Sequence, residues 1–160
     1  MDGEKCQLDI LDTAGQEEYV RSWAPRDFLT LQMRDNYYRL GEGFLCVYSI
    51  TMKDTFNAVH RFYDHILQVK GKDEVPLILV GSKCDLETDR EVNKDEGKQL
   101  AEKFSCPFFE TSAKTRVNVD EVFEELVRIV QKSKKQDTDP ADRGKEATGE
   151  KGKEGCCVMM

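Results

Sequence analysis

The stretch ILDTAGQEEY, residues 10–19, decides how the rest of this chain is interpreted. A short apolar run, CQLDIL at residues 6–11, ends at Asp12 and opens into a turn of small residues that closes with Gln16. A carboxylate at the end of a strand can hold a magnesium ion, directly or through water, and a glycine lets the backbone approach a phosphate closely. An ordinary turn after a strand uses the same residue types, so the interpretation depends on what the other loops contain.

Composition limits the class of protein. The chain has 160 residues, enough for one domain with a real core, and a formal net charge of −7 with a pI near 5.0. This charge argues against nucleic acid as a main partner, because duplex binding depends on neutralising phosphates with Lys and Arg. We find no apolar run of membrane-spanning length and no signal-peptide core at the start, so the six cysteines are expected to be reduced thiols in the cytosol.

The order of elements predicts an α/β fold. Continuous apolar runs at 44–50, 76–81 and 107–112 are typical of strands that are covered on both faces, and 6–11 is a shorter one. Amphipathic helices are predicted between and after them, with caps at Asp54, Asn93 and Asn118; Asn93 and Asn118 each have a glutamate three residues later. Strands that alternate with helices form a parallel sheet with helices on both faces, and ligands bind at the carboxyl ends of its strands.

Two further loops follow strands and carry suitable chemistry. Ser82-Lys83-Cys84-Asp85 contains a carboxylate that can accept two hydrogen bonds from a guanine edge, and a Lys whose stem can lie along the base. Ser112-Ala113-Lys114 has small residues that leave room for a base and backbone N–H groups that can meet its oxygen. A plain surface turn is the alternative for each loop alone.

Together these segments resemble the Ras family of small GTPases. The matching pieces are DTAGQEE, GEGFLCVYSI, VGSKCDL, ETSAKTR and a terminal Cys-aliphatic-aliphatic-X box, in the right order over most of residues 2–132. The resemblance implies a P-loop NTPase-like fold of three layers and a switch that binds GTP or GDP with Mg²⁺. It also implies exchange factors, effectors and GTPase-activating proteins as partners.

The resemblance also assigns roles to individual residues. It makes Asp12 the magnesium-associated aspartate, acting through water, Gly15 the γ-phosphate sensor with Thr13 and Ala14 beside it, and Gln16 the catalytic, water-orienting residue. The guanine clamp would consist of Lys83 and Asp85, supported by Ser112, Ala113 and Lys114. The two histidines, His60 and His65, are predicted to be surface or boundary residues without a catalytic role.

The phosphate cradle of this family is missing from the sequence. No G-x-x-x-x-G-K-[ST] segment, which would hold phosphates with backbone N–H groups, a Lys and a hydroxyl, occurs in the 160 residues. We therefore expect an incomplete sheet that lacks the first two strands and the first helix, together with the first switch. The family's first strand lies between the strands that match 6–11 and 44–50, so its loss predicts either an unpaired edge at 44–50 or direct pairing of the two remaining strands in a new register. Either arrangement predicts a domain of marginal stability.

Two departures concern single segments. Residues 20–32, VRSWAPRDFLTLQ, are an insertion in the second switch, and Pro25 would break the short helix expected there. They are either a lineage-specific interaction loop or a translated intron or misjoined gene model, and the late start of the chain favours the second explanation. Ser82 stands where the family has Asn in N-K-x-D, and a hydroxyl cannot replace the paired donor and acceptor of an amide, so guanine binding is expected to be weaker.

The C-terminal part changes in composition. Residues 133–155 contain no aromatic residue and almost nothing apolar, which predicts a disordered linker after a partial G domain at 1–132. Residues 156–160 form a lipidation box with Cys157 as the farnesyl site, and Cys156 is the predicted palmitoyl site because the linker has little net positive charge. Two unmodified terminal cysteines are the alternative. Lipidation predicts a protein at the cytoplasmic face of the plasma membrane; without it the chain would be cytosolic.

Two functions follow from these observations. The first is a membrane-anchored, Ras-like GTPase of signal transduction, whose site would consist of Asp12, Gly15, Gln16, Lys83, Asp85 and Ala113. The second is a non-enzymatic, lipid-anchored fragment or partial gene model without nucleotide-dependent switching. Because phosphate contacts dominate binding in the family, the purified chain is predicted not to hold GTP measurably.

Overall fold

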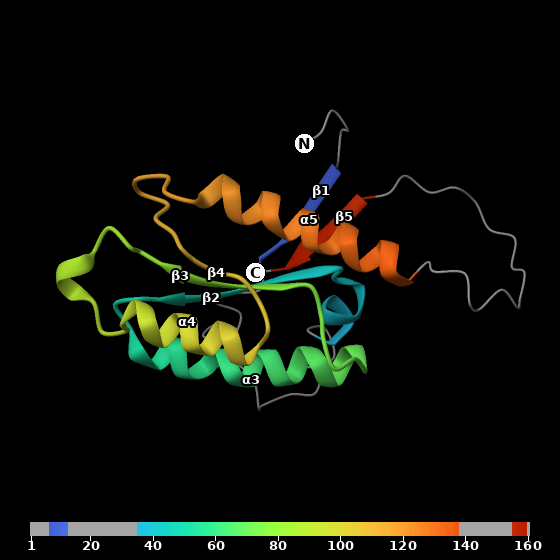
Figure 1. Ribbon diagram of the computed structural model, residues 1–160, viewed down its shortest axis with the longest axis horizontal. Helices are drawn as coiled ribbons and strands as arrows, with labels where there is room; N and C mark the ends of the chain where they lie inside the picture. Colours follow the sequence, from blue (N-terminus) through green and yellow to red (C-terminus); the bar gives the residue numbers. More distant parts are fainter. Residues whose placement is uncertain (1–6, 13–34, 138–154, 160) are drawn as a thin grey trace, which may run out of the picture.

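A computed structural model describes residues 7–12, 35–137 and 155–159, and these residues form one parallel sheet with helices on both faces (Figure 1). The sheet has five strands in the order β1-β5-β2-β3-β4. The strands are β1 (Gln7–Leu11), β2 (Gly43–Ser49), β3 (Leu77–Ser82), β4 (Phe108–Glu110) and β5 (Gly155–Met159). The helices are α3 (Lys53–Lys70), α4 (Lys94–Lys103) and α5 (Val119–Asp137), with a 3-10 turn η1 (Glu87–Asp89) and a helical segment at 35–40.

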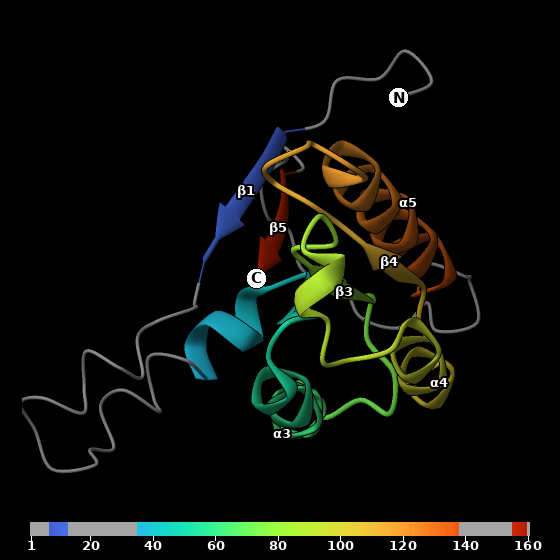
Figure 2. The same cartoon turned by 90° about the vertical axis from the view of Figure 1, so that its left-hand side faces the viewer.

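Strands β2, β3 and β4 form the centre of the fold. Phe44 pairs with Leu77 and Leu79 with Phe108, all in parallel, as the continuous apolar runs predict. Alternate residues of β2 and β3 belong to two separate apolar clusters, one packed with residues of α3 and α4 and the other with residues of α5. Figure 2 shows α5 on one face of the sheet and α3 and α4 on the other. The predicted α/β class with helices on both faces is therefore confirmed.

Helix ends follow the sequence prediction in one case of three. At α4, Asn93 and Glu96 form the expected capping box. Helix α3 begins at Lys53, so Asp54 lies within its first turn, and the backbone N–H of Lys53 donates to the Glu91 carboxylate instead. Asn118 has a positive φ of 55°, and its side-chain amide donates to the Glu110 carbonyl at 2.8 Å. The expected cap, in which this side chain accepts from a backbone N–H of the first helical turn, is not the bond it makes.

The C-terminal region differs from the predicted linker at both of its ends. Helix α5 continues to Asp137, past the boundary at residue 133, because its apolar stripe is followed by good helix formers, including Lys134 and Lys135 in its last turn. Gly155 is not linker but the first residue of β5. Residues 138–154, and the insertion at 20–32, lie outside the described residues.

Strand β5 is the part of the fold that the sequence interpretation did not foresee. It lies between β1 and β2 and pairs in parallel with both. Figure 1 shows β1, in blue, and β5, in red, side by side. Of the two expected arrangements, direct pairing of 6–11 with 44–50 is not formed, because the C-terminal segment lies between them. The unpaired edge is present in part, since only Gly43 and Phe44 of β2 have a strand partner on this side among the described residues. Val47, on the α5 face of β2, is 45% exposed.

The register of β5 sets the height of β1 in the sheet. Met159 pairs with Leu11 on one side and with Phe44 on the other, and Phe44 pairs with Leu77. Leu11 is therefore level with the first residue of β3, and β1 ends where β2 and β3 begin. This offset matters for the site, because strand ends that are not level do not bring their loops together.

Candidate guanine-nucleotide site

The loops after β3 and β4 meet at the carboxyl edge of the central strands. Cys84 N–H donates to the Thr111 carbonyl at 3.0 Å, and Thr111 N–H donates to the Gly81 carbonyl at 2.8 Å, so the two loops start side by side. Lys83, the residue directly after β3, has a positive φ of 63°, which turns the chain sharply at the end of this strand. The predicted neighbourhood of Ser82–Asp85 and Ser112–Lys114 is therefore formed.

A hydrogen bond fixes the carboxylate of this corner. The Ser112 hydroxyl, which is fully buried, donates to Asp85 Oδ1 at 2.6 Å and accepts from the Thr115 N–H at 3.1 Å. This bond is the main reason that the pKa of Asp85 lies below its ordinary value, with a smaller contribution from the charge of Lys114. The carboxylate is thus held ionised, as an acceptor of two parallel N–H donors must be.

The remaining residues of the corner are open to solvent. Lys83, Ala113 and Lys114 are exposed, and Asp85 is half-buried. A planar ligand with adjacent N–H donors could therefore reach Asp85 from solvent, with the stem of Lys83 along one side. The corner has the polar groups for a base and no cover above it among the described residues.

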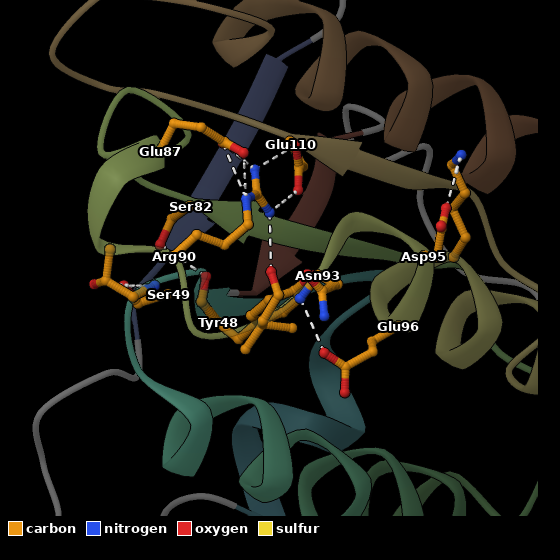
Figure 3. Close-up of polar contacts among 12 residues, drawn as sticks. Tyr48, Ser49, Ser82, Glu87, Arg90, Asn93, Asp95, Glu96 and Glu110 are labelled. Carbon is orange, nitrogen blue, oxygen red and sulfur yellow. Dashed lines mark hydrogen bonds and ion pairs between the residues drawn. The ribbon is translucent and has the colours of Figure 1, made fainter.

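Ser82 does not face this corner with a free hydroxyl. Its Oγ donates to the Tyr48 carbonyl at 2.8 Å, between β3 and β2 (Figure 3). The side chain that replaces the family's Asn is thus used within the sheet, where β2 and β3 run in register. The expected weakening of guanine binding by Ser82 stays a prediction.

Asp12 is not brought to the same corner. It follows Leu11, so its level in the sheet is that of Leu45 and Ile78, and Ser82 is four steps of about 3.3 Å, or roughly 13 Å, further along β3. Thr13, Ala14, Gly15 and Gln16 lie outside the described residues, and so their predicted roles stay predictions. The described residues contain no group of three or more His, Cys, Asp or Glu side chains that could hold a metal ion, and a Mg²⁺ site is not assembled from them.

A nearly buried ion pair between Arg90 and Glu110 fixes the segment after Asp85 to β4, and sequence reasoning missed it. Arg90 donates to both carboxylate oxygens of Glu110, at 2.7 and 3.2 Å, while its Nε and second terminal nitrogen contact Glu87 (Figure 3). The side chains of Arg90 and Glu110 are 12% and 11% exposed. These bonds to Glu110 and Glu87 raise the pKa of Arg90. The segment that follows Asp85 is therefore fixed to β4, two residues before Ser112.

A signal for this pair exists in the sequence, although it is weak. Glu110 is the one charged residue in the apolar run PFFETS, and a charge in a buried strand needs a partner. Nothing in the sequence identifies Arg90 as that partner among the many basic residues.

One further observation concerns the helices: none of those described is long and apolar enough to cross a membrane.

Comparisons with known proteins agree with the geometry. The family model described as "Ras family" matches residues 1–132. The Ras-like protein rasS of Dictyostelium discoideum is 53% identical over 134 residues, which are 84% of this chain and 63% of rasS. The Ras-like protein rasB of the same organism is 46% identical over 163 residues (100% and 76%), and the Ras-related protein O-RAL of Diplobatis ommata is 46% identical over 162 residues (99% and 73%). This chain belongs to the Ras family of small GTPases.

Proposed function

We propose that this chain is a guanine-nucleotide-binding protein of membrane-associated signal transduction in which the described residues supply base recognition. The observation that carries this proposal is the hydrogen bond between Ser112 and Asp85, because it joins the two base-binding loops and keeps the carboxylate ionised. Lys83 lies two residues before Asp85 in the same loop and is exposed. Family membership supports GTP and GDP, with Mg²⁺, as the ligand class.

We further propose that the 160-residue polypeptide binds guanine nucleotides weakly and hydrolyses GTP slowly or not at all. Three observations support this. The sequence contains no G-x-x-x-x-G-K-[ST] segment, Ser82 is bonded to Tyr48 rather than open to a base, and Asp12 lies well below the corner of Asp85. The phosphates of a nucleotide would therefore add little to the affinity of the base.

Comparing ligands that differ only in their phosphates tests this directly. Guanosine, GDP and ADP are titrated into the purified chain with and without Mg²⁺, and bound nucleotide is extracted from the protein as isolated. We expect guanosine and GDP to bind with affinities within about tenfold of each other, and ADP more weakly than GDP. Stoichiometric GDP in the extract, or GDP at least a hundredfold tighter than guanosine, would overturn weak binding; equal binding of ADP and GDP would overturn base recognition.

Two variants refine the same experiment. Asp85→Asn replaces one acceptor oxygen by a donor and should remove the preference for guanine over adenine. Asp89→Asn, an exposed aspartate of η1, is the matched control and should leave that preference unchanged. Ser82→Asn restores an amide at the position of the family's N-K-x-D and should strengthen guanosine binding.

We also propose that the chain reaches the cytoplasmic face of a membrane through its terminal box, with a farnesyl group on Cys157 and a palmitoyl group on Cys156. The residue order Cys157-Val158-Met159-Met160 supports a farnesyl-type site, and a second signal is needed because one lipid chain binds a bilayer only marginally. Metabolic labelling of cells that express the chain, with Cys157→Ser as the control, tests it. Equal label in the two proteins would contradict the proposal.

A further inference from the structure

The C-terminal strand occupies an acceptor position between β1 and β2. Gln7 to Leu11 pair one by one with Gly155 to Met159, and on the other side Gly43 and Phe44 pair with Val158 and Met159. Figure 2 shows β5 lying alongside β1. The segment is thus bonded through its main chain on both sides, which is the position of an interior strand and not of an edge.

The composition of the segment suits this position. Residues 155–159 have no charge and no proline, and they follow a long polar stretch in which charged residues are frequent. A proline or a charge is what natural edge strands use to prevent pairing, and neither is present here. Without β5, the main-chain groups of β1 would be left without partners among the described strands, since β1 pairs with no other strand there.

The same five residues include the cysteines of the lipidation box. Cys156 pairs with Leu8 and Cys157 with Asp9, both near the middle of the β1–β5 pairing. An enzyme that modifies Cys157 has to hold this residue and the three that follow it. It cannot do so while the backbone of residues 157–159 is paired in the sheet. Strand pairing and lipidation therefore compete for one segment.

We propose that the gap between β1 and β2 is a strand-binding site whose occupant is the chain's own C-terminal segment, and that lipid attachment requires this segment to leave the sheet. The lipid part of the inference rests on the proposed farnesylation of Cys157, whereas the strand part does not. In the attachment step the Cys157 thiolate attacks C1 of farnesyl diphosphate. A C–S bond forms, the C–O bond to diphosphate breaks, diphosphate leaves, and the thiol proton passes to solvent.

A designed disulfide tests the strand and its register. The background carries Cys6→Ser, Cys84→Ser and Cys156→Ser; Cys46 and Cys106 remain, because burial raises their pKa to about 12 and about 11 and makes them slow to react. Asp9→Cys then places a thiol opposite Cys157, at a strand spacing of about 4.8 Å that falls within the range for disulfides. Oxidised glutathione takes up the two electrons and two protons of the two thiols.

The matched control is Ile10→Cys in the same background. Its register partner is Val158, and it lies on the opposite face of β1 from Asp9, so it has no thiol within reach. We expect an intramolecular disulfide in the Asp9→Cys chain at a rate at least tenfold above the control. Equal rates in the two variants, or a disulfide that joins two chains, would overturn the assignment of the chain's own segment to this site.

A second disulfide tests the competition. Leu8→Cys lies opposite the native Cys156, so oxidation of this variant locks the strand but leaves the Cys157 thiol free. With purified farnesyltransferase and farnesyl diphosphate, the locked chain should be modified at least tenfold more slowly than the same chain after reduction. Leu8→Ser, treated identically, should show no dependence on oxidation.

A peptide of residues 150–160 separates the two proposals. It has no sheet to pair with, so it should be farnesylated faster than the unlocked chain. Failure of the peptide to react would overturn lipidation, and the exchange with it, while a positive first disulfide would still establish the strand. A locked chain that is farnesylated as fast as the reduced one would overturn the competition alone.

Discussion

Ser112 Oγ lies 2.6 Å from Asp85 Oδ1, and this hydrogen bond connects two loops that are 27 residues apart in sequence. It does so at the carboxyl ends of β3 and β4, where a parallel sheet places its ligand site. The donor is fully buried while the acceptor stays within reach of solvent. The pair thus sets the position and the charge of the one carboxylate that the base-recognition proposal requires.

Replacing Ser112 with Ala should raise the pKa of Asp85 towards its ordinary value, because the main cause of its lowering is removed. A lowered pKa in the folded state stabilises the protein above the pKa of the unfolded chain, and this stabilisation is lost as the pH falls through the folded-state pKa. Urea unfolding should therefore show that Ser112→Ala lowers the free energy of unfolding at pH 7, and that it lowers it by less near pH 3. Thr88→Ala, an exposed hydroxyl of η1, is the control; equal losses at both pH values would contradict the role of ionised Asp85.

Breaking the ion pair of Arg90 and Glu110 should destabilise the fold strongly. Both side chains are nearly buried, and removing one partner leaves an uncompensated charge, so Arg90→Met and Glu110→Gln should each cost about 3 kcal/mol of unfolding free energy. The double variant should cost less than the sum, as in any cycle of contacting residues. Arg128→Met removes exposed pairs with Glu124 and Glu125 and should change the free energy by less than about 0.5 kcal/mol. Additive losses from the two single changes would contradict direct coupling.

Removing the Tyr48 hydroxyl should stabilise the protein. This oxygen is buried and has no hydrogen-bond partner within the described residues, and burial is the main reason that the pKa of Tyr48 is raised. A buried polar atom without a partner is unfavourable, so Tyr48→Phe should raise the free energy of unfolding by about 1 kcal/mol, measured by urea titration. Tyr63→Phe, at a partly buried ring stacked on Phe104, should be close to neutral. A loss of stability in Tyr48→Phe would show that the hydroxyl has a partner after all.

The buried thiol of Cys46 and the partly buried thiol of Cys106 predict a loss of stability at high pH. Burial is the main cause that raises the pKa of Cys46 to about 12 and that of Cys106 to about 11, whereas an unfolded cysteine has its ordinary value near 9. The unfolded chain therefore releases these protons first, so stability is complete below pH 9 and falls as the pH rises towards 11. Each group contributes at most about 1.4 kcal/mol per pH unit in that window.

Unfolding at pH 8 and pH 10.5 measures this effect. Cys106→Ala should make the loss between the two pH values smaller by about 2 kcal/mol, which is 1.5 pH units of a single group. Cys84→Ala serves as the comparison, because the pKa of that thiol is raised by less than the pKa of Cys106. An unchanged pH dependence in Cys106→Ala would contradict the assignment.

Much of the central fold was predictable from the sequence, because local patterns determine it. The apolar runs of β2 and β3 require burial on both faces, and the capping box of Asn93 and Glu96 is a local signal that no distant residue has to complete. Where distant residues complete a feature, prediction failed. The backbone N–H of Lys53, at the start of α3, donates to Glu91, and Glu110 is neutralised by Arg90. Spacing along the chain identifies neither Glu91 nor Arg90 as the partner.

The candidate site was predictable in part for the same reason. Each candidate base-binding loop follows its strand directly, so Asp85 and Ser112 come together once β3 and β4 are adjacent. Asp12 depends on the register of β1, and this register is set by Met159 at the other end of the chain. The pattern of residues 155–159 is typical of a lipidation box and does not predict a strand.

The sheet is held together across β5 by two residue pairs, Gly43 with Val158 and Phe44 with Met159, whereas β2 and β3 share six. By its main-chain pairing the sheet therefore consists of a three-stranded block and a two-stranded ribbon joined to it at one corner, with Leu8 and Leu11 of the ribbon packed against the apolar clusters of the block. Heat or pulling on the N-terminus should release the ribbon as a separate cooperative unit before the block unfolds. Amide hydrogens of β1 should then exchange with solvent at a common rate, well before those of Ile78 and Leu79, and unfolding should proceed in two steps.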